Sequence, residues 1–312
     1  MTAWSVREVP LKYQLSDWSL FSISLSLQCR SVSLFGESPV STPEPPSLDE
    51  LAEGSQGFMV RALPIVDELP QISERNGYIC YIPLQYEHCY IDLTLTFDDY
   101  QKKFSSKTRS TINRKIKKYA EHCGGKIHWK TFKEPEQIRE FFDLARQVSK
   151  LTYQERLLDA GIPESESYVR QAESLAAENR VRAFILFDGD RPISYLYCPV
   201  EQGVLIYAYL GYDPEYMKLS VGIVLQWLAL EVLFADNCFK AFDFTEGQSD
   251  HKRLFATHHT RRANVILVKA SLHNRVIIYS HFFMNQFSHW LGATLNKLGL
   301  RAKIRKLIRF RL

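Results

Sequence analysis

A strand, a helix and a second strand follow one another late in the chain, and this succession constrains the fold more than any other feature of the sequence. The apolar stretch GVLIYAYLGYD (203–213) predicts a strand, residues 220–235 predict a long apolar helix, and KAFDFT (240–245) predicts a buried strand. Open α/β sheets bind their ligands at the ends of such strands. The sequence therefore predicts a mixed α/β fold whose site lies at a strand end.

The first hundred residues have a different character. Phe21, Ile23, Leu25 and Leu27 alternate with polar residues, which predicts a half-buried strand. We expect a mostly β region here, followed by mixed structure. Further strands are predicted at 57–63, 77–84, 89–95, 126–132, 181–188, 192–200 and 263–271, and further helices at 106–122, 135–150, 165–179, 274–296 and 298–312.

Positive charge is concentrated in two segments. Lys102–Lys118 contains eight cations and residues 297–312 contain seven, in both cases without an acid, and the net charge of +4 becomes −11 when they are left out. Local positive charge favours anionic ligands. For the helix at 106–122 a solvated basic face is the simpler interpretation, with a site for an acidic acceptor or an anionic polymer as the alternative. RAKIRKLIRF (301–310) suits either an anionic membrane surface or docking on the protein's own acidic body.

Several classes of protein are disfavoured. The six cysteines are scattered without zinc spacing, which indicates free thiols in a reducing compartment, and His258–His259 has no matching ligands, so we expect no metal. No run of 18 apolar residues occurs, and serines interrupt the apolar stretch near the N-terminus, so we expect neither a transmembrane helix nor a signal peptide. A cytoplasmic protein is the expectation.

Two motifs flank the predicted helix at 220–235. At its start, Ser220-Val221-Gly222 would let a phosphate approach free backbone amides, and the alternative is an ordinary capped helix with a packing glycine. After the next strand, FDFTEGQSDHKRLFAT (242–257) places acids, a histidine and two cations where a buried strand ends. This second motif predicts either a ligand site or an exposed turn.

The order of these elements and their sequence motifs resemble those of a known family. The S-x-G helix, the strand ending in DF-x-x-G, the basic helix SSKTRSTINRKIKKY (105–119) and the phrase LTYQERLLDAGIP (151–163) are similar to the GNAT acyltransferase superfamily. They look most like its CelD-like acetyltransferase branch, which is related to the Fem-type peptidyltransferases. The resemblance covers roughly residues 57–270.

This resemblance implies a site for acetyl-coenzyme A where two neighbouring parallel strands, 203–212 and 240–245, separate. The backbone of Leu210, Gly211 and Tyr212 would face the pantetheine arm, and the amides of Leu219, Ser220, Val221, Gly222 and Ile223 would hold the pyrophosphate. One departure concerns the phosphate loop: residues 218–223 keep a cation and one glycine, but lack the second small residue of the family's Q/R-x-x-G-x-G/A pattern.

Acyl transfer to an amine needs a base and donors for the developing oxyanion. On the resemblance, Asp243, Glu246 and His251 are the candidate bases, although Asp243 would equally suit backbone hydrogen bonds and His251 a surface position. Lys252 would hold a phosphate or an acidic acceptor. Tyr153 and Gln154 would lie in a loop over the acceptor cleft, unless they simply end a helix.

The predicted organisation is a GNAT-like domain at 101–272, preceded by a degenerate β-rich half at 1–100 and followed by basic helices at 273–312. The predicted function is acetyl transfer from acetyl-coenzyme A to an amine or hydroxyl of a small molecule, saccharide or peptide, in a bacterial cytoplasm or at the inner face of the membrane. The alternatives are aminoacyl transfer from tRNA and a non-catalytic scaffold at the membrane surface.

Overall fold

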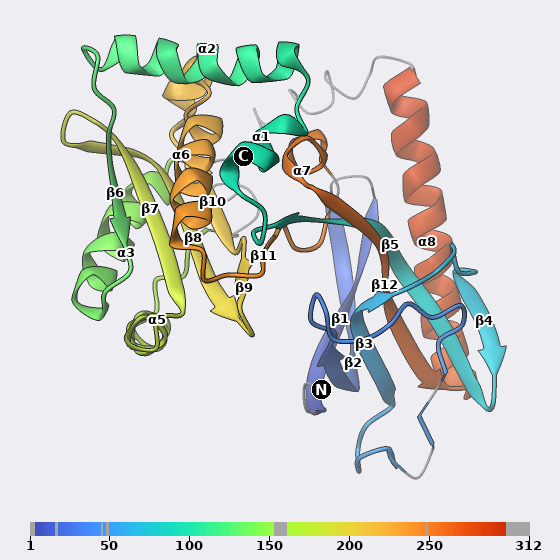
Figure 1. The fold of residues 1–312 in the computed structure, drawn as a ribbon. Coiled ribbons are helices and arrows are strands. Elements are labelled where there is room, and N and C mark those ends of the chain that lie inside the picture. Colours follow the sequence, from blue (N-terminus) through green and yellow to red (C-terminus); the bar gives the residue numbers. More distant parts are fainter. Residues whose placement is uncertain are drawn as a thin grey trace. The chain divides into compact units, whose positions relative to one another are not determined.

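The structure is a computed structural model, and it describes residues 4–15, 18–44, 46–47, 50–152, 161–247 and 249–297. The chain forms two compact units (Figure 1). Unit 1 comprises Met1–Glu87 and Thr260–Leu312, and unit 2 comprises His88–His259. Two strands, β5 (Tyr78–Asp92) and β12 (His258–Lys269), belong to both units because the chain passes from one to the other within them.

Unit 1 is a mixed sheet with one long helix. Strand β1 pairs antiparallel with β2, β2 pairs parallel with β3, and β3 pairs antiparallel with β12. Helix α8 packs on this sheet, where the Tyr13 hydroxyl donates to the carbonyl of Ile277 at 3.0 Å. Its elements, besides β5 and β12, are β1 (Ser5–Leu15), β2 (Trp18–Ser31), β3 (Gly57–Pro64), β4 (Ile72–Arg75) and α8 (Leu272–Lys297).

Strand β5 corrects one prediction. The sequence predicted two strands, 77–84 and 89–95, but the structure has a single strand over Tyr78–Asp92. The residues between the two predicted strands contain neither glycine nor a turn signal, so nothing stops the extended chain. The turn lies earlier, at Asn76-Gly77, where both residues have positive φ and join β4 to β5 as a hairpin.

Unit 2 contains the strand–helix–strand succession. Its sheet order is β6–β7–β8–β9–β11, with β11 also paired with the end of β5 and β10 paired with β8. Its elements are α1 (Phe97–Lys102), α2 (Ser106–His122), β6 (His128–Phe132), α3 (Pro135–Ser149), α5 (Glu166–Ala177), β7 (Val181–Asp188), β8 (Arg191–Glu201), β9 (Val204–Ile206), β10 (Tyr209–Tyr212), the 3₁₀ helix η2 (Pro214–Leu219), α6 (Val221–Asp236), β11 (Ala241–Asp243) and α7 (Asp250–Phe255).

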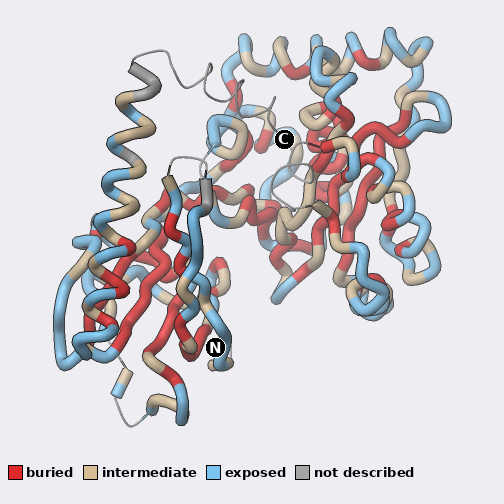
Figure 2. The backbone as a smooth tube through the Cα atoms, turned by 180° about the vertical axis from the view of Figure 1, so that it is seen from behind, coloured by how far each residue is buried: buried red, intermediate tan, exposed pale blue. Residues whose placement is uncertain are grey.

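Helices cover both faces of this sheet. Alternate residues of β7 point to opposite sides: Phe184 and Leu186 join a core with α2 and α6, whereas Ala183 and Ile185 join a core with α3 and α5. Helix α6 is buried along most of its length, as its apolar sequence predicts (Figure 2). The predicted mixed α/β fold is thus confirmed. Among the residues that the structure describes, none of the helices has the length and apolarity needed to cross a membrane.

Candidate functional site

Strands β9 and β11 run parallel and then separate. They pair from Val204–Ala241 to Ile206–Asp243, and the Tyr207 amide donates to the Asp243 carbonyl at 2.8 Å as the last bond between them. Beyond that point β10 pairs with β8, and within the described part of the chain it makes no pairing with β11. The single strand predicted at 203–213 is therefore two strands: both pair with β8, and the register of that pairing shifts between Leu205 and Tyr209, where the chain moves away from β11. This separation is where the resemblance implied an opening for the donor.

Strand β10 presents the residues expected to face a pantetheine arm. Leu210 and Tyr212 are half-buried, whereas Gly211 is buried. A Cβ atom on Gly211 would lie 2.4 Å from a ring carbon of Tyr195, so this position requires glycine for packing. The Gly211 carbonyl accepts a hydrogen bond from the Ser194 hydroxyl at 3.0 Å. The edge of β10 that faces away from β8 is the one next to the opening.

The start of α6 differs from the prediction in its details. Ser220 occupies the N-cap position in a left-handed conformation (φ 55°, ψ 38°), and its side chain makes no cap hydrogen bond, so the predicted cap is wrong. Its amide donates to the Met217 carbonyl at 3.0 Å, and the Ile223 amide donates to the Ser220 carbonyl at 2.9 Å. Leu219 ends helix η2. Val221 and Gly222 are the first two residues of α6. Their amides are not used for hydrogen bonds within the helix, because no helical carbonyl precedes them by a full turn.

The basic helix α2 lies beside this helix start. Lys118 Nζ donates to the Lys218 carbonyl at 3.1 Å, which places one cation of α2 next to the turn before α6. Helix α2 is fixed there by its buried face: Tyr119 is fully buried and its hydroxyl donates to the Phe187 carbonyl at 2.6 Å. The backbone amides of α6 and the cations of α2 together form an anion-attracting region.

At the end of β11, Asp243 is buried against a histidine that the sequence analysis missed. His88 Nε2 lies 2.6 Å from Asp243 Oδ1, and both side chains are more than 90% buried. The same carboxylate oxygen accepts the amide of Thr245 at 2.7 Å. Thr245 has a positive φ of 60°, which is unusual for a β-branched residue. A lone histidine inside a strand gives no distinguishing signal in the sequence, so only the pairing of β5 with β11 reveals it.

His251 lies on α7 with a neutral partner. Its Nε2 is 2.5 Å from Oε1 of Gln226, a fully buried residue of α6. Burial, together with the charges of Lys115 and Lys252, lowers the pKa of His251 to about 4. At neutral pH the imidazole is therefore uncharged. Gln226 is a second residue that could not be found from the sequence. It lies within an apolar helix, where a single polar residue does not indicate a function.

Lys252 and Glu246 lie close together in the turn after β11. Lys252 Nζ donates to the Glu246 carbonyl at 2.7 Å, while the Glu246 side chain is exposed. Burial lowers the pKa of Lys252, and the neighbouring groups Cys89, Asp243 and Glu246 oppose this effect. Asp243 and Lys252 are thus close enough for their charges to interact. Tyr153 and Gln154 lie outside the described residues.

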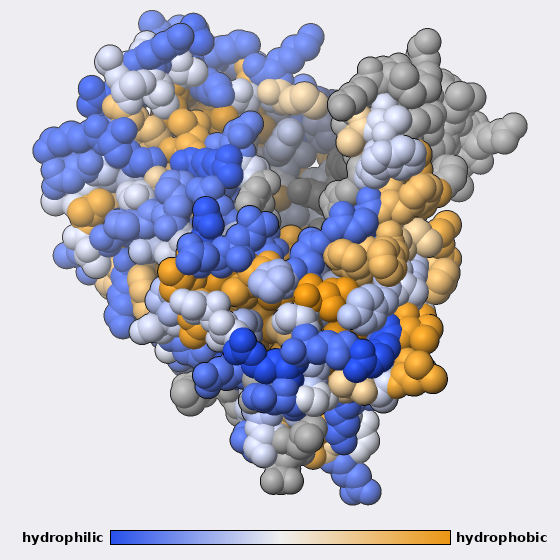
Figure 3. Space-filling model, turned by 90° about the vertical axis from the view of Figure 1, so that its right-hand side faces the viewer, coloured by the Kyte–Doolittle hydropathy of each residue, from blue (hydrophilic) through white to orange (hydrophobic). Residues whose placement is uncertain are grey.

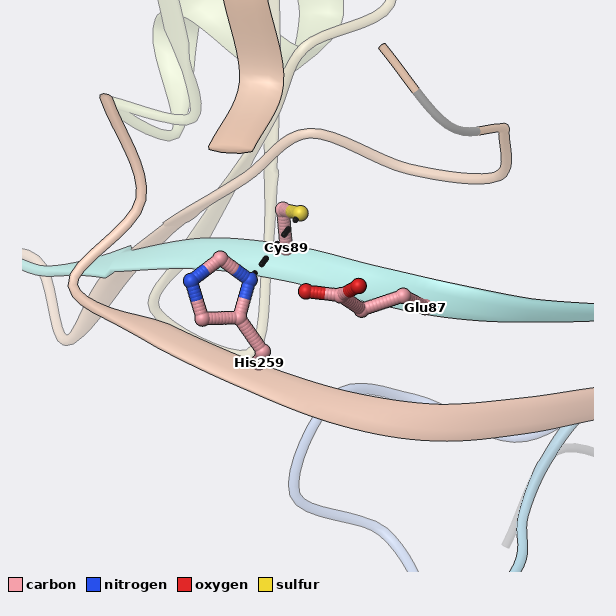
Figure 4. A group of neighbouring side chains, drawn as sticks. All are labelled: Glu87, Cys89 and His259. Carbon is pink, nitrogen blue, oxygen red and sulfur yellow. Dashed lines mark hydrogen bonds between the residues drawn. The ribbon is translucent and has the colours of Figure 1, made fainter. Parts of the chain in front are cut away.

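A thiol and a further histidine lie near Lys252. The Sγ atom of buried Cys89 is 3.4 Å from Nδ1 of His259, and Figure 4 shows the pair together with Glu87, which precedes Cys89 by two residues on β5. Thiols and imidazoles are zinc ligand types. Lys103 also interacts electrostatically with Cys89, and burial lowers the pKa of Lys103 to about 8. Two lysines beside the thiol oppose the binding of a divalent cation.

Comparison with known proteins finds one family similarity within unit 2. Residues 106–253 match the family model described as an acetyltransferase (GNAT) domain, which agrees with the resemblance to the GNAT superfamily seen in the sequence. No curated protein matches the chain.

Among solved structures, the chain resembles a C-terminal DUF2156 domain from Agrobacterium fabrum (12% identity, 61% of this chain and 62% of that one, TM-score 0.43). It also resembles FemX (11% identity, 58% and 61%, TM-score 0.40) and L-PGS from Bacillus licheniformis (13% identity, 77% and 74%, TM-score 0.45). The chain spans about three fifths of the length of the first two.

Proposed function

We propose, from the acetyltransferase (GNAT) domain at residues 106–253, that this chain transfers an acyl group from a coenzyme A thioester to an amine or hydroxyl of a small molecule, saccharide or peptide in a bacterial cytoplasm. The observation that carries the proposal is the separation of β10 from β11 immediately beyond a parallel pair. Acetyl is the proposed acyl group.

The residues present fit such a donor. Strand β10 offers a backbone edge to the pantetheine amides, and the amides of Val221 and Gly222 would receive the pyrophosphate. Lys118 and Lys218 would add positive charge. A Cβ atom on Gly222 would meet the nearest ring atom of Tyr212 at 3.4 Å, so a methyl side chain fits at this position with ordinary contacts.

We assign proton removal from the acceptor to Asp243, which lies at the end of β11 where the strands separate. Both ring nitrogens of His88 are buried, and Nε2 lies 2.6 Å from Asp243 Oδ1, so His88 positions the carboxylate and does not itself reach the acceptor. His251 is a weaker base because its pKa is about 4. Lys252 would stabilise negative charge on the donor or the acceptor.

Calorimetric titration with acetyl-coenzyme A tests the donor site. We expect a Kd in the micromolar range, about −8 kcal/mol. Gly222→Trp should abolish binding by filling the space beside Tyr212, whereas Gly222→Ala should retain it, since its added Cβ makes an ordinary contact. Thermal unfolding checks that both variants fold. The proposal is wrong if the wild type does not bind or if the tryptophan variant binds as tightly as the wild type.

A second candidate is aminoacyl transfer from tRNA, which the cations of α2 favour. Among the described residues, the ion pairs of α2 are near its C-terminal end: Lys117 lies 3.9 Å from Glu121, and His122 lies 3.1 Å from Asp188. This function predicts tRNA binding that weakens steeply with salt and is lost on charge reversal at Arg109 and Arg114. Charge reversal at Lys126 and Lys133, exposed in the same unit, is the matched control. Equal tRNA binding by the two double variants would remove this candidate.

A further inference from the structure

Helix α8 of unit 1 has one face held in the core. Ile277 and Ile278 are buried with residues of β1, β2 and β12. His281 is also buried, and its Nδ1 lies 2.8 Å from the Tyr81 hydroxyl. These contacts fix which side of α8 faces the sheet.

The rest of the helix surface carries an unexpected set of large apolar side chains. The set, here called the α8 stripe, is between 50 and 81% exposed. Its members are Leu272, Val276, Phe283, Phe287 and Trp290.

These five positions share one side of the helix. With 3.6 residues per turn they fall within a sector of about 60°, and from Leu272 to Trp290 they extend for about 27 Å. Figure 3 shows exposed hydrophobic surface on the side of the molecule that it presents. Single exposed apolar residues are ordinary, but a continuous row of them marks an interaction surface.

The charge composition of α8 and of the sequence that follows it points to one kind of partner for the stripe. Residues 270–312 contain no aspartate or glutamate. They contain eight cations: Arg275, Lys297, Arg301, Lys303, Arg305, Lys306, Arg309 and Arg311. Arg275 is paired with Glu74 of β4.

An apolar and aromatic row on a helix that is followed in the sequence by an acid-free basic segment matches an anionic lipid surface. Lipid headgroups attract the cations, and the phenylalanine and tryptophan side chains enter the boundary between headgroups and acyl chains. A second copy of this chain fits less well, because its own acid-free segment would repel the first.

We propose that α8 docks on an anionic phospholipid bilayer, with the α8 stripe inserted at the headgroup boundary and the helix lying along the surface. The inference rests on unit 1 alone and holds whether or not the chain transfers an acyl group. It differs from attraction by the basic residues 297–312, because apolar insertion persists at salt concentrations that screen charges.

Vesicle flotation of the full chain tests the proposal. Vesicles of phosphatidylcholine with 30% phosphatidylglycerol should float the wild type, and pure phosphatidylcholine should float it at least tenfold less well. The variant F283S/F287S/W290S should lose at least tenfold in partitioning at 0.5 M salt. The matched control F35S/V66S removes two side chains of the same unit that are 58% and 51% exposed, and it should float like the wild type.

Three results would overturn the proposal. One is wild-type flotation by the triple variant at 0.5 M salt, which would leave the basic residues as the only attachment. Another is failure of the wild type to float with either vesicle. The third is a concentration-dependent dimer that the triple variant loses, which would make a second copy the occupant. Because the replaced side chains are at least half-exposed, thermal unfolding of the variant should match the wild type.

Discussion

His88 and His251 are two largely enclosed histidines of unit 2 whose partners differ in kind. His88 faces the carboxylate of Asp243 at 2.6 Å, and His251 faces the amide of Gln226 at 2.5 Å. A carboxylate can take up a proton, whereas an amide cannot. One histidine therefore positions a candidate base, and the other is itself held neutral by burial.

Asp243→Asn should have the largest effect. We expect kcat with acetyl-coenzyme A to fall by about a hundredfold or more, because the asparagine amide cannot take the proton from the acceptor. His251→Gln should lower kcat by less than about tenfold, because the pKa of about 4 makes His251 a weak base. Steady-state rates at saturating donor measure both variants, and the calorimetric Kd for the donor should change in neither.

A larger loss of kcat in His251→Gln than in Asp243→Asn would reverse the contrast between the two histidines. If His251→Gln lost a hundredfold while Asp243→Asn kept the wild-type rate and fold, the buried carboxylate would be structural and the amide-bound histidine catalytic. The pH dependence of kcat separates a catalytic from a structural loss, because removal of a general base also removes the corresponding limb of the rate profile.

Most elements of unit 2 could be predicted because each has its own local signal. The basic helix was predicted at 106–122 and is found at Ser106–His122, and the strand predicted at 181–188 is found at Val181–Asp188. Periodicity fixes such elements without reference to the rest of the fold. Asp243 was predicted as a candidate base from its place at a strand end, and it does lie beside an imidazole.

The partners of these residues could not be predicted, because they depend on which strands pair. His88 meets Asp243 only because the end of β5 lies next to β11, although the two residues are 155 positions apart. The break between β9 and β10 has the same origin: the apolar stretch 203–213 has one uninterrupted pattern, and both halves pair with β8, but its second half moves away from β11. The left-handed conformation of Ser220 is likewise set by the turn that η2 forms before it.

A smaller effect should appear in the stability of the fold as the pH changes. The pKa of His251 is about 4 in the folded chain and about 6.5 when unfolded, so between these values the unfolded state binds more protons. The free energy of unfolding should therefore fall as the pH drops from about 6.5 to about 4. With allowance for partial exposure, the loss is about 2–3 kcal/mol.

Chemical denaturation at several pH values measures this loss, and His251→Gln should remove it. A parallel decline in the wild type and the glutamine variant would mean that other groups cause the pH dependence. His281 is buried in unit 1, and burial lowers its pKa. His281→Gln is therefore the matched variant: it should remove a separate loss of stability that also occurs as the pH falls.

The smallest effect concerns a third histidine, His259, whose partner is the thiol of Cys89 at 3.4 Å. A thiol and an imidazole would suit zinc, but Lys103 and Lys252 both interact electrostatically with Cys89, and a divalent cation there would be repelled. Dialysis against a chelator should therefore leave both the acyl-transfer rate and the unfolding midpoint unchanged. Loss of either on chelation, with recovery on adding zinc, would contradict this prediction. Lys103→Met tests the reason directly, because removing one cation should strengthen any zinc binding that the Cys89–His259 pair supports.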